Sequence, residues 1–211
     1  MQNYKQTFFV TLLSLVLTNA ALALPVTVNA AGTVTSVTTY GSFTFDGSVM
    51  AGSAMTGSCY YDPDTAADLN ASEYVGEYSI PSISMAIGNY DFTENPMPPN
   101  SAKFKVWKTD IAYLAQTTDG MMSLNNTPLG YAGVVVTLLD LCNASVSGAN
   151  DDLPTAFPNV SLFTYRNRFE VCLANNFSIS GVIDSITVIP EPMTITLFAL
   201  GTLMFRRVSR H

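Results

Sequence analysis

The sequence predicts an all-β protein, with an antiparallel β-sandwich or jelly-roll-like domain over residues 24–189 between two apolar terminal segments. Three observations predict this class. Apolar and polar residues alternate with a period of two in several segments, as in half-buried antiparallel strands. Clusters of turn-forming residues separate those segments. The middle of the chain contains no long segment with the 3.6-residue apolar period of a helix.

The alternation marks the expected strands in chain order. Short examples are Phe43 with Phe45, and the set Ile83, Met85 and Ile87. The remaining expected strand segments are Lys103–Val106, Val134–Leu141, Phe163–Val171 and Val182–Val188. Three segments rich in turn-forming residues predict loops: Pro63–Asp64, Asn95–Asn100 and Ser147–Pro158. Residues 24–40 are compatible with an edge strand or a loose leader, and Ile111–Gln116 with one short helical turn.

The N-terminal segment, residues 1–23, has the features of a secretory signal peptide. Lys5 supplies a positive charge, Phe8–Leu17 is apolar apart from Thr11 and Ser14, and Ala21-Leu22-Ala23 is an A-x-A cleavage site. The alternatives are a buried helix or an uncleaved anchor, and a second possible cleavage region is Ala30–Ala31. The apolar stretch is short for a membrane span. We therefore exclude residues 1–23 from the expected fold.

The C-terminal segment has three parts in a fixed order. Pro190-Glu191-Pro192 is followed by the apolar run Met193–Phe205 and then by the basic residues Arg206, Arg207 and Arg210. Thirteen helical residues extend roughly 20 Å, against about 30 Å for the hydrocarbon core of a bilayer. Physical reasoning alone leaves two alternatives for this hydrophobic helix: a marginal transmembrane helix or a buried core helix.

In its three parts and their order, this tail resembles a PEP-CTERM sorting signal, which occurs on exported proteins of Gram-negative bacteria. The resemblance covers roughly residues 188–211, with Pro190, Glu191, Pro192, Arg206 and Arg207 matching the motif. It implies recognition by an exosortase and removal of the tail near Pro-Glu-Pro. Met193 departs from the pattern, which commonly has a small residue there.

The resemblance further implies a cell-surface or extracellular protein associated with exopolysaccharide or a biofilm matrix. Its expected partners are the Sec translocon, the exosortase and, transiently, the membrane. With the two terminal segments set aside, residues 24–192 keep all 16 acidic residues but five of the nine basic residues, so their formal net charge is −11. This charge argues against a nucleic-acid partner.

Few residues are suited to catalysis. His211 is the single histidine and lies beyond the sorting motif, which argues against His-dependent nucleophilic catalysis. Cys59, Cys142 and Cys172 lie too far apart in sequence for a zinc motif. We therefore expect a non-catalytic protein. A secreted glycosidase is the third-ranked alternative, with the candidate carboxylate pairs Glu73 with Glu77 and Asp151 with Asp152.

The second-ranked alternative is a lectin-like carbohydrate-binding module, for which calcium is a candidate cofactor. Tyr60 and Tyr61 are candidate ligand-binding residues, because sugar rings stack on aromatic side chains. Asp62, Asp64 and Asp68 are candidate calcium ligands, since calcium prefers oxygen donors. The spacing is not that of an EF-hand, and turn-stabilising hydrogen bonds are the alternative role for these carboxylates.

Two further features remain open at this point. In an oxidising compartment Cys142 and Cys172 are the preferred disulfide pair, and three buried thiols are the alternative. Lys103, Lys105 and Lys108 surround Trp107 in the one local basic patch. Because Lys103 and Lys105 alternate with apolar residues, they indicate the solvated face of a strand. Contact with an acidic polysaccharide is the alternative.

Overall fold

A computed structural model describes most of the chain between the two terminal segments. The described residues are 25–70, 72, 74–94, 102–107, 111–143, 152–154 and 156–190. The predicted signal peptide and everything after Pro190 lie outside them, as do Glu73, Lys108 and Asp151.

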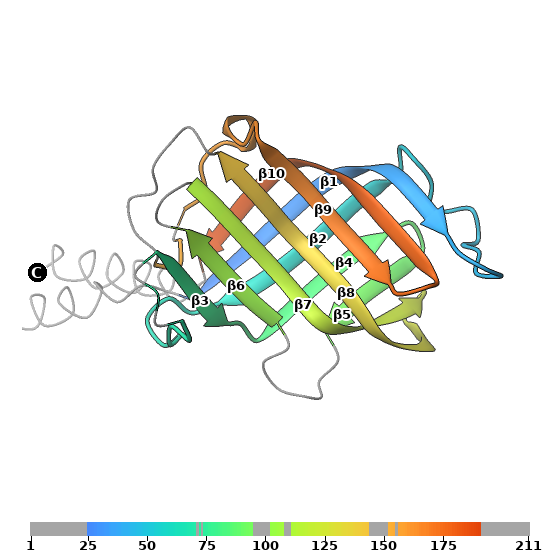
Figure 1. The fold of residues 1–211 in the computed structure, drawn as a ribbon, viewed down its shortest axis with the longest axis horizontal. Helices are drawn as coiled ribbons and strands as arrows, with labels where there is room; N and C mark the ends of the chain where they lie inside the picture. Colours follow the sequence, from blue (N-terminus) through green and yellow to red (C-terminus); the bar gives the residue numbers. More distant parts are fainter. Residues whose placement is uncertain are drawn as a thin grey trace, which may run out of the picture.

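Ten strands and one short 3-10 helix are described. Their bounds are β1 Val26–Thr39, β2 Ala54–Tyr61, β3 Val75–Ser79, β4 Ser82–Ile87, β5 Tyr90–Glu94, β6 Ala102–Trp107, β7 Ile111–Leu124, β8 Thr127–Asn143, η2 Val160–Leu162, β9 Arg166–Leu173 and β10 Phe177–Pro190. The strands form one antiparallel sheet in the order β3-β6-β7-β5-β4-β2-β1-β10-β9-β8, and β8 pairs with β7 as well (Figure 1).

The pairing of β7 with β8 closes the sheet into a barrel. Eight strands (β1, β2, β4, β5, β7, β8, β9 and β10) form a ring in which each strand pairs with two neighbours. The predicted sandwich or jelly roll is therefore wrong. Alternation shows that one face of each strand is buried, but it does not show whether the facing wall belongs to a second sheet or to the same sheet curled round.

Closure also corrects the interpretation of residues 24–40. Val26–Thr39 of this segment form β1, which pairs with β2 on one side and with β10 on the other, so β1 is not an edge strand. The Ile111–Gln116 segment, expected as one helical turn, is the start of β7. Phe43 and Phe45, expected in a strand, lie in the loop between β1 and β2.

Strands that follow one another in the chain are neighbours in the ring, except that β3 and β6 lie outside it. β3 and β4 are separated by Ile80 and Pro81, and a proline cannot donate the backbone hydrogen bond that a central strand needs. β5 and β6 occupy successive parts of one edge of β7, where Glu94 pairs with Gly120 and Ala102 pairs with Thr117. The β3–β6 ladder therefore widens the barrel wall on one side.

The barrel interior is filled by side chains, as an eight-stranded barrel allows. Tyr61, Phe92, Phe104, Phe169 and Phe177 are the bulkiest fully buried residues. Aromatic side chains also close both ends. At one end Phe43 and Phe45 from the β1–β2 loop pack on Phe177 with ring centroids 5.1 and 5.2 Å apart. At the other end Phe157 and Phe163 pack on Tyr113.

The fold class predicted from the sequence also included a hydrophobic, transmembrane C-terminal helix. The described part of the chain ends in a strand, β10. Within the described residues, no helix is long and apolar enough to cross a bilayer. The predicted helix within residues 193–205 falls outside the described residues.

Candidate functional site

The start of β1 and the end of β10 lie side by side in the barrel wall. Val26 pairs with Pro190 and Thr27 with Ile189, so β1 begins where β10 ends. Of the predicted sorting motif, Pro190 is the last described residue, and Glu191, Pro192, Arg206 and Arg207 lie beyond it. The junction with the predicted signal peptide and the junction with the predicted tail are therefore at the same end of the barrel.

One outer face of the barrel carries all four basic residues of the described structure, and we call it the cationic face. It is formed by the outward side chains of four neighbouring strands, namely Lys103, Lys105 and Trp107 on β6, Ala112, Leu114 and Gln116 on β7, Thr137, Asp140 and Cys142 on β8, and Arg166, Arg168 and Glu170 on β9. Figure 1 shows these strands crossing in front of β1, β2 and β4.

Asp140 is the centre of this face. It is 6% exposed, and its two carboxylate oxygens accept hydrogen bonds from Arg166 Nη1 at 3.1 Å and from Arg168 Nε at 2.7 Å. Hydrogen bonding to Asp140 raises the pKa of Arg166 above its ordinary value. The carboxylate therefore holds both guanidinium groups in fixed positions on the face.

A β-bulge places Asp140 on the outside. Leu138 and Leu139 together stand opposite single residues of the neighbouring strands, because Thr137 pairs with Glu170 and Asp140 pairs with Arg168. Both leucines are fully buried. A bulge adds one residue and so changes which side chains face outward. Strict alternation through Val134–Leu141 would turn Asp140 inward, and this is why the pairing with Arg166 and Arg168 was missed in the sequence.

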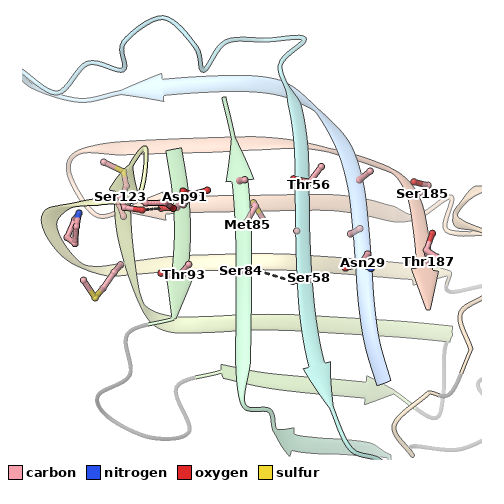
Figure 2. Close-up of a pocket in the computed structure, with 18 residues that line it drawn as sticks. Asn29, Thr56, Ser58, Ser84, Met85, Asp91, Thr93, Ser123, Ser185 and Thr187 are labelled. Carbon is pink, nitrogen blue, oxygen red and sulfur yellow. Dashed lines mark hydrogen bonds between the residues drawn. The ribbon is translucent and has the colours of Figure 1, made fainter. Parts of the chain in front are cut away.

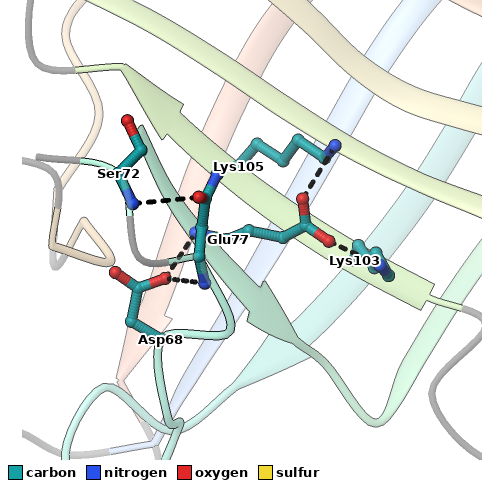
Figure 3. Close-up of polar contacts among 6 residues, drawn as sticks. Asp68, Ser72, Glu77, Lys103 and Lys105 are labelled. Atoms are coloured by element: carbon teal, nitrogen blue, oxygen red, sulfur yellow. Dashed lines mark hydrogen bonds and ion pairs between the residues drawn. The ribbon is translucent and has the colours of Figure 1, made fainter. Parts of the chain in front are cut away.

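A second ion-pair cluster borders the cationic face. Two lysines form ion pairs with the carboxylate of Glu77 on β3. Lys103 Nζ lies 2.5 Å from Oε1, and Lys105 Nζ lies 2.9 Å from Oε2 (Figure 3). Hydrogen bonds from Lys103 and then Lys105 lower the pKa of Glu77. The outward direction of the two lysines on β6 confirms their predicted place on the solvated side of a strand.

A groove of about 400 Å³ lies on the cationic face. Trp107 stands on one side and Arg166 and Arg168 on the other. The side chains between them include the small Ala112 and Cys142, which lie in one cross-strand row with Trp107 and Arg166. The groove thus combines a large aromatic ring, two positioned cations and the polar groups of Gln116 and Glu170.

Two of the three candidate calcium ligands, Asp62 and Asp68, accept backbone hydrogen bonds in turns. Asp62 Oδ1 accepts a hydrogen bond from the backbone N–H of Asp64 at 3.0 Å. Asp68 Oδ1 accepts from the N–H groups of Asn70 and Glu77, both at 2.9 Å (Figure 3). Among the residues that the structure describes, no three acidic, histidine or cysteine side chains are grouped so as to hold a metal ion. Asp62, Asp64 and Asp68 are not brought together as one ligand set.

Tyr60 and Tyr61, the candidate ligand-binding residues, are the last two residues of β2, and their side chains face opposite sides of the sheet. Tyr61 is fully buried, and its hydroxyl group donates to the carbonyl oxygen of Pro154 at 2.5 Å. Burial raises the pKa of Tyr61 above its ordinary range. Tyr60 is partly exposed on the outer face. A joint ligand site for the two rings is therefore not formed.

The predicted disulfide partners are also apart. All three cysteines are thiols in the structure. Cys172 pairs with Val135 and Cys142 with Arg166, at opposite ends of the β8–β9 ladder. The six positions from Arg166 to Cys172 along β9 correspond to roughly 20 Å, several times the Cα separation that a disulfide tolerates. The structure therefore does not bring Cys142 and Cys172 together.

The opposite wall of the barrel carries a second, larger hollow of about 780 Å³ (Figure 2). It is lined mainly by short, uncharged side chains, and we call it the hydroxyl face. One cross-strand row passes through Thr187, Asn29, Ser58, Ser84 and Thr93. The Ser58 and Ser84 hydroxyl groups are hydrogen-bonded at 2.9 Å. Asp91 also lines the hollow.

Comparisons with protein-family models, with curated proteins and with solved structures found no match. The similarity of the tail to a sorting signal therefore depends on residues 188–211 alone.

Proposed function

We propose that this protein is an exported, non-catalytic protein of the cell surface or extracellular matrix. A signal peptide directs it to the Sec translocon, and an exosortase processes its tail at Pro190-Glu191-Pro192. The expected association with exopolysaccharide follows from the resemblance of this tail.

The pairing of β1 with β10 supports the proposal most directly. Val26 lies opposite Pro190, so the two terminal segments leave the barrel at neighbouring positions. This arrangement suits a precursor whose two terminal segments are both processed at one membrane. The folded barrel between them can then stand on one side of that membrane while each end is cut.

Processing in the native host tests the proposal. A variant with Pro190→Ala and Pro192→Ala should accumulate as a precursor that retains residues 191–211, as shown by mass spectrometry of the C-terminal peptide. Pro128→Ala, in the hairpin segment at the start of β8, is the matched control and should be processed normally.

Two results would contradict the proposal. One is an extracellular wild-type protein that still carries residues 191–211. The other is unchanged localisation after residues 190–211 are deleted. Since Pro190 is the last residue of β10, the deletion removes little of the barrel. A melting temperature close to that of the intact chain would show that the barrel is preserved.

A further inference from the structure

The distribution of charge over the barrel is strongly uneven. Residues 24–192 carry a formal net charge of −11, yet every basic residue that the structure describes lies on the cationic face. The same face holds Trp107, the single tryptophan of the chain. The face and its border also hold Glu77, Asp140 and Glu170, so their formal charge is +1, while the rest of residues 24–192 sums to −12. An anionic ligand is therefore favoured here over the remaining surface.

The two arginines retain hydrogen-bonding capacity beyond Asp140. A guanidinium group has five N–H donors, and the bonds to Asp140 use one nitrogen of each arginine. The side chains of Arg166 and Arg168 are 47% and 53% exposed. Donors held in place by a buried carboxylate lose less conformational entropy when a planar carboxylate of a ligand binds.

The rest of the groove is suited to a sugar ring. Trp107 presents an aromatic surface on which the C–H face of a pyranose can stack. Gln116 and Glu170 line the same groove and supply acceptors for hydroxyl groups. A volume of about 400 Å³ lies within the range of small-ligand sites, roughly 300–1,000 Å³. A ligand that contacts Trp107, the hydrogen-bond acceptors and the two arginines carries a sugar ring, hydroxyl groups and a carboxylate.

The cations extend across the whole face. One cross-strand row runs through Lys105, Leu114, Asp140 and Arg168. Three strand spacings separate Lys105 from Arg168, which corresponds to roughly 14 Å. Successive charged residues of a polymer fit this separation better than a monosaccharide does.

We propose that the cationic face binds an acidic polysaccharide through its uronic acid residues. Trp107 stacks on a sugar ring, Arg166 and Arg168 bind its carboxylate, and the lysines of β6 attract the neighbouring residues of the chain. This proposal rests on the exopolysaccharide association of the proposed function and names its site and ligand class. Binding in solution depends on neither the signal peptide nor the exosortase, so the two proposals can fail separately.

The test is isothermal titration calorimetry on the full chain, purified in mild detergent. The probes are polygalacturonate and alginate, with dextran as a neutral polymer and polyphosphate as an anion that lacks sugar rings. Both uronate polymers should bind, and their affinity should fall as salt is raised from low to physiological ionic strength. Dextran and polyphosphate should bind at least about tenfold more weakly, a difference of about 1.4 kcal/mol.

Variants assign the binding to the groove. Trp107→Ala and Arg168→Lys should each weaken polygalacturonate binding by about tenfold, because one removes the ring and the other the planar fork. Tyr74→Ala is the matched control: Tyr74 is 61% exposed outside the groove, and its loss should leave the affinity unchanged. Arg168→Lys keeps the charge beside Asp140, so its melting temperature should stay close to that of the wild type.

The proposal is overturned if neither uronate polymer binds, or if polyphosphate binds as tightly as they do. It is also overturned if both groove variants bind like the wild type. Each of these outcomes leaves the processing of the C-terminal tail unaffected.

Discussion

The cationic face and the hydroxyl face both lie on the outer surface of the closed barrel, but they carry different side chains. Each has a cross-strand row of five residues. On the cationic side the row is Glu77, Lys105, Leu114, Asp140 and Arg168, and on the hydroxyl side it is Thr187, Asn29, Ser58, Ser84 and Thr93. The first row contains four charged groups and the second contains none.

The difference concerns how firmly the side chains are held. On the cationic face, carboxylates with little exposure clamp long cationic side chains, as Asp140 does with Arg166 and Arg168. On the hydroxyl face the side chains are short, so little conformational entropy is lost in ordering them. The row across the larger hollow therefore holds no charged donor in a fixed position. Fixed donors beside an aromatic ring make the smaller groove the better candidate for selective recognition.

Gly57 connects the two faces, and its substitution should have the largest effect. A Cβ at Gly57, on β2, would overlap the Leu138 side chain and lie 2.9 Å from the carbonyl oxygen of Ser84. Leu138 is part of the bulge that turns Asp140 outward. Gly57→Val should therefore destabilise the protein by about 3 kcal/mol, as overpacking does. Denaturant unfolding measures this loss.

A matched pair of variants checks that Leu138 causes the effect. Ala86→Val changes an outward-facing residue on the neighbouring strand β4, and it should alter stability by less than about 0.5 kcal/mol. The double variant Gly57→Ala with Leu138→Ala should cost less than the sum of the two single variants, since contacting residues couple. Strict additivity would show that the two faces are independent.

Asp140→Asn should have the next largest effect. It removes the charge that binds Arg166 and Arg168 while it keeps the shape of the side chain, so about 1–3 kcal/mol of stability should be lost. The matched control is Asp184→Asn on β10, where an exposed aspartate accepts one hydrogen bond from Thr33 at 2.7 Å. The control should cost less than about 1 kcal/mol. Equal losses would contradict the assigned difference between a clamped and an exposed carboxylate.

Glu77 should give a smaller effect that depends on pH. Its pKa lies below the ordinary value of 4.5 because Lys103 and Lys105 donate to its carboxylate. A carboxylate with a lowered folded-state pKa stabilises the protein above its unfolded-state pKa, and this stabilisation is lost as the pH falls through the folded-state pKa. The melting temperature of the wild type should therefore fall more on acidification below about pH 4.5 than that of Glu77→Gln.

Lys105→Met serves as the partial control for this pH dependence. It leaves Glu77 with Lys103 as a partner, so its acid sensitivity should lie between those of the wild type and Glu77→Gln. Parallel acid profiles of all three proteins would show that the lysine pairs contribute nothing to stability, as is common for exposed ion pairs.

Sequence periodicity predicted the local elements better than their arrangement. The alternation around Ile83–Ile87 and Lys103–Val106 identified β4 and β6, because a period of two depends on neighbours in the chain alone. Barrel closure depends on the pairings of β7 with β8 and of β1 with β10, which local patterns do not encode. Phe43 and Phe45 alternate for another reason, since both cover one end of the barrel.

The candidate site was predicted in part for the same reason. Lys103, Lys105 and Trp107 were found because β6 is regular. The bulge at Leu138 and Leu139 interrupts the alternation of inward and outward side chains along β8. The outward direction of Asp140 could therefore not be inferred from the sequence. Tyr60 and Tyr61 are adjacent in sequence, but adjacency in a strand places two side chains on opposite sides of the sheet. The structure therefore places the candidate ligand-binding groups on β6 and β9, whereas the sequence predicted them at the end of β2.

The smallest expected effect concerns the three cysteine thiols, whose alkylation rates should differ without a change in stability. Cys59 is 1% exposed inside the barrel, and burial raises its pKa to about 12. Cys142 and Cys172 lie on the outside and are partly exposed. Alkylation near pH 8, followed by peptide mass spectrometry, should therefore label Cys59 at the rate of unfolding, because the thiolate is the reactive form. Cys142 and Cys172 should be labelled faster. A peptide that links Cys142 to Cys172 would contradict the register of the β8–β9 ladder and the groove built on it.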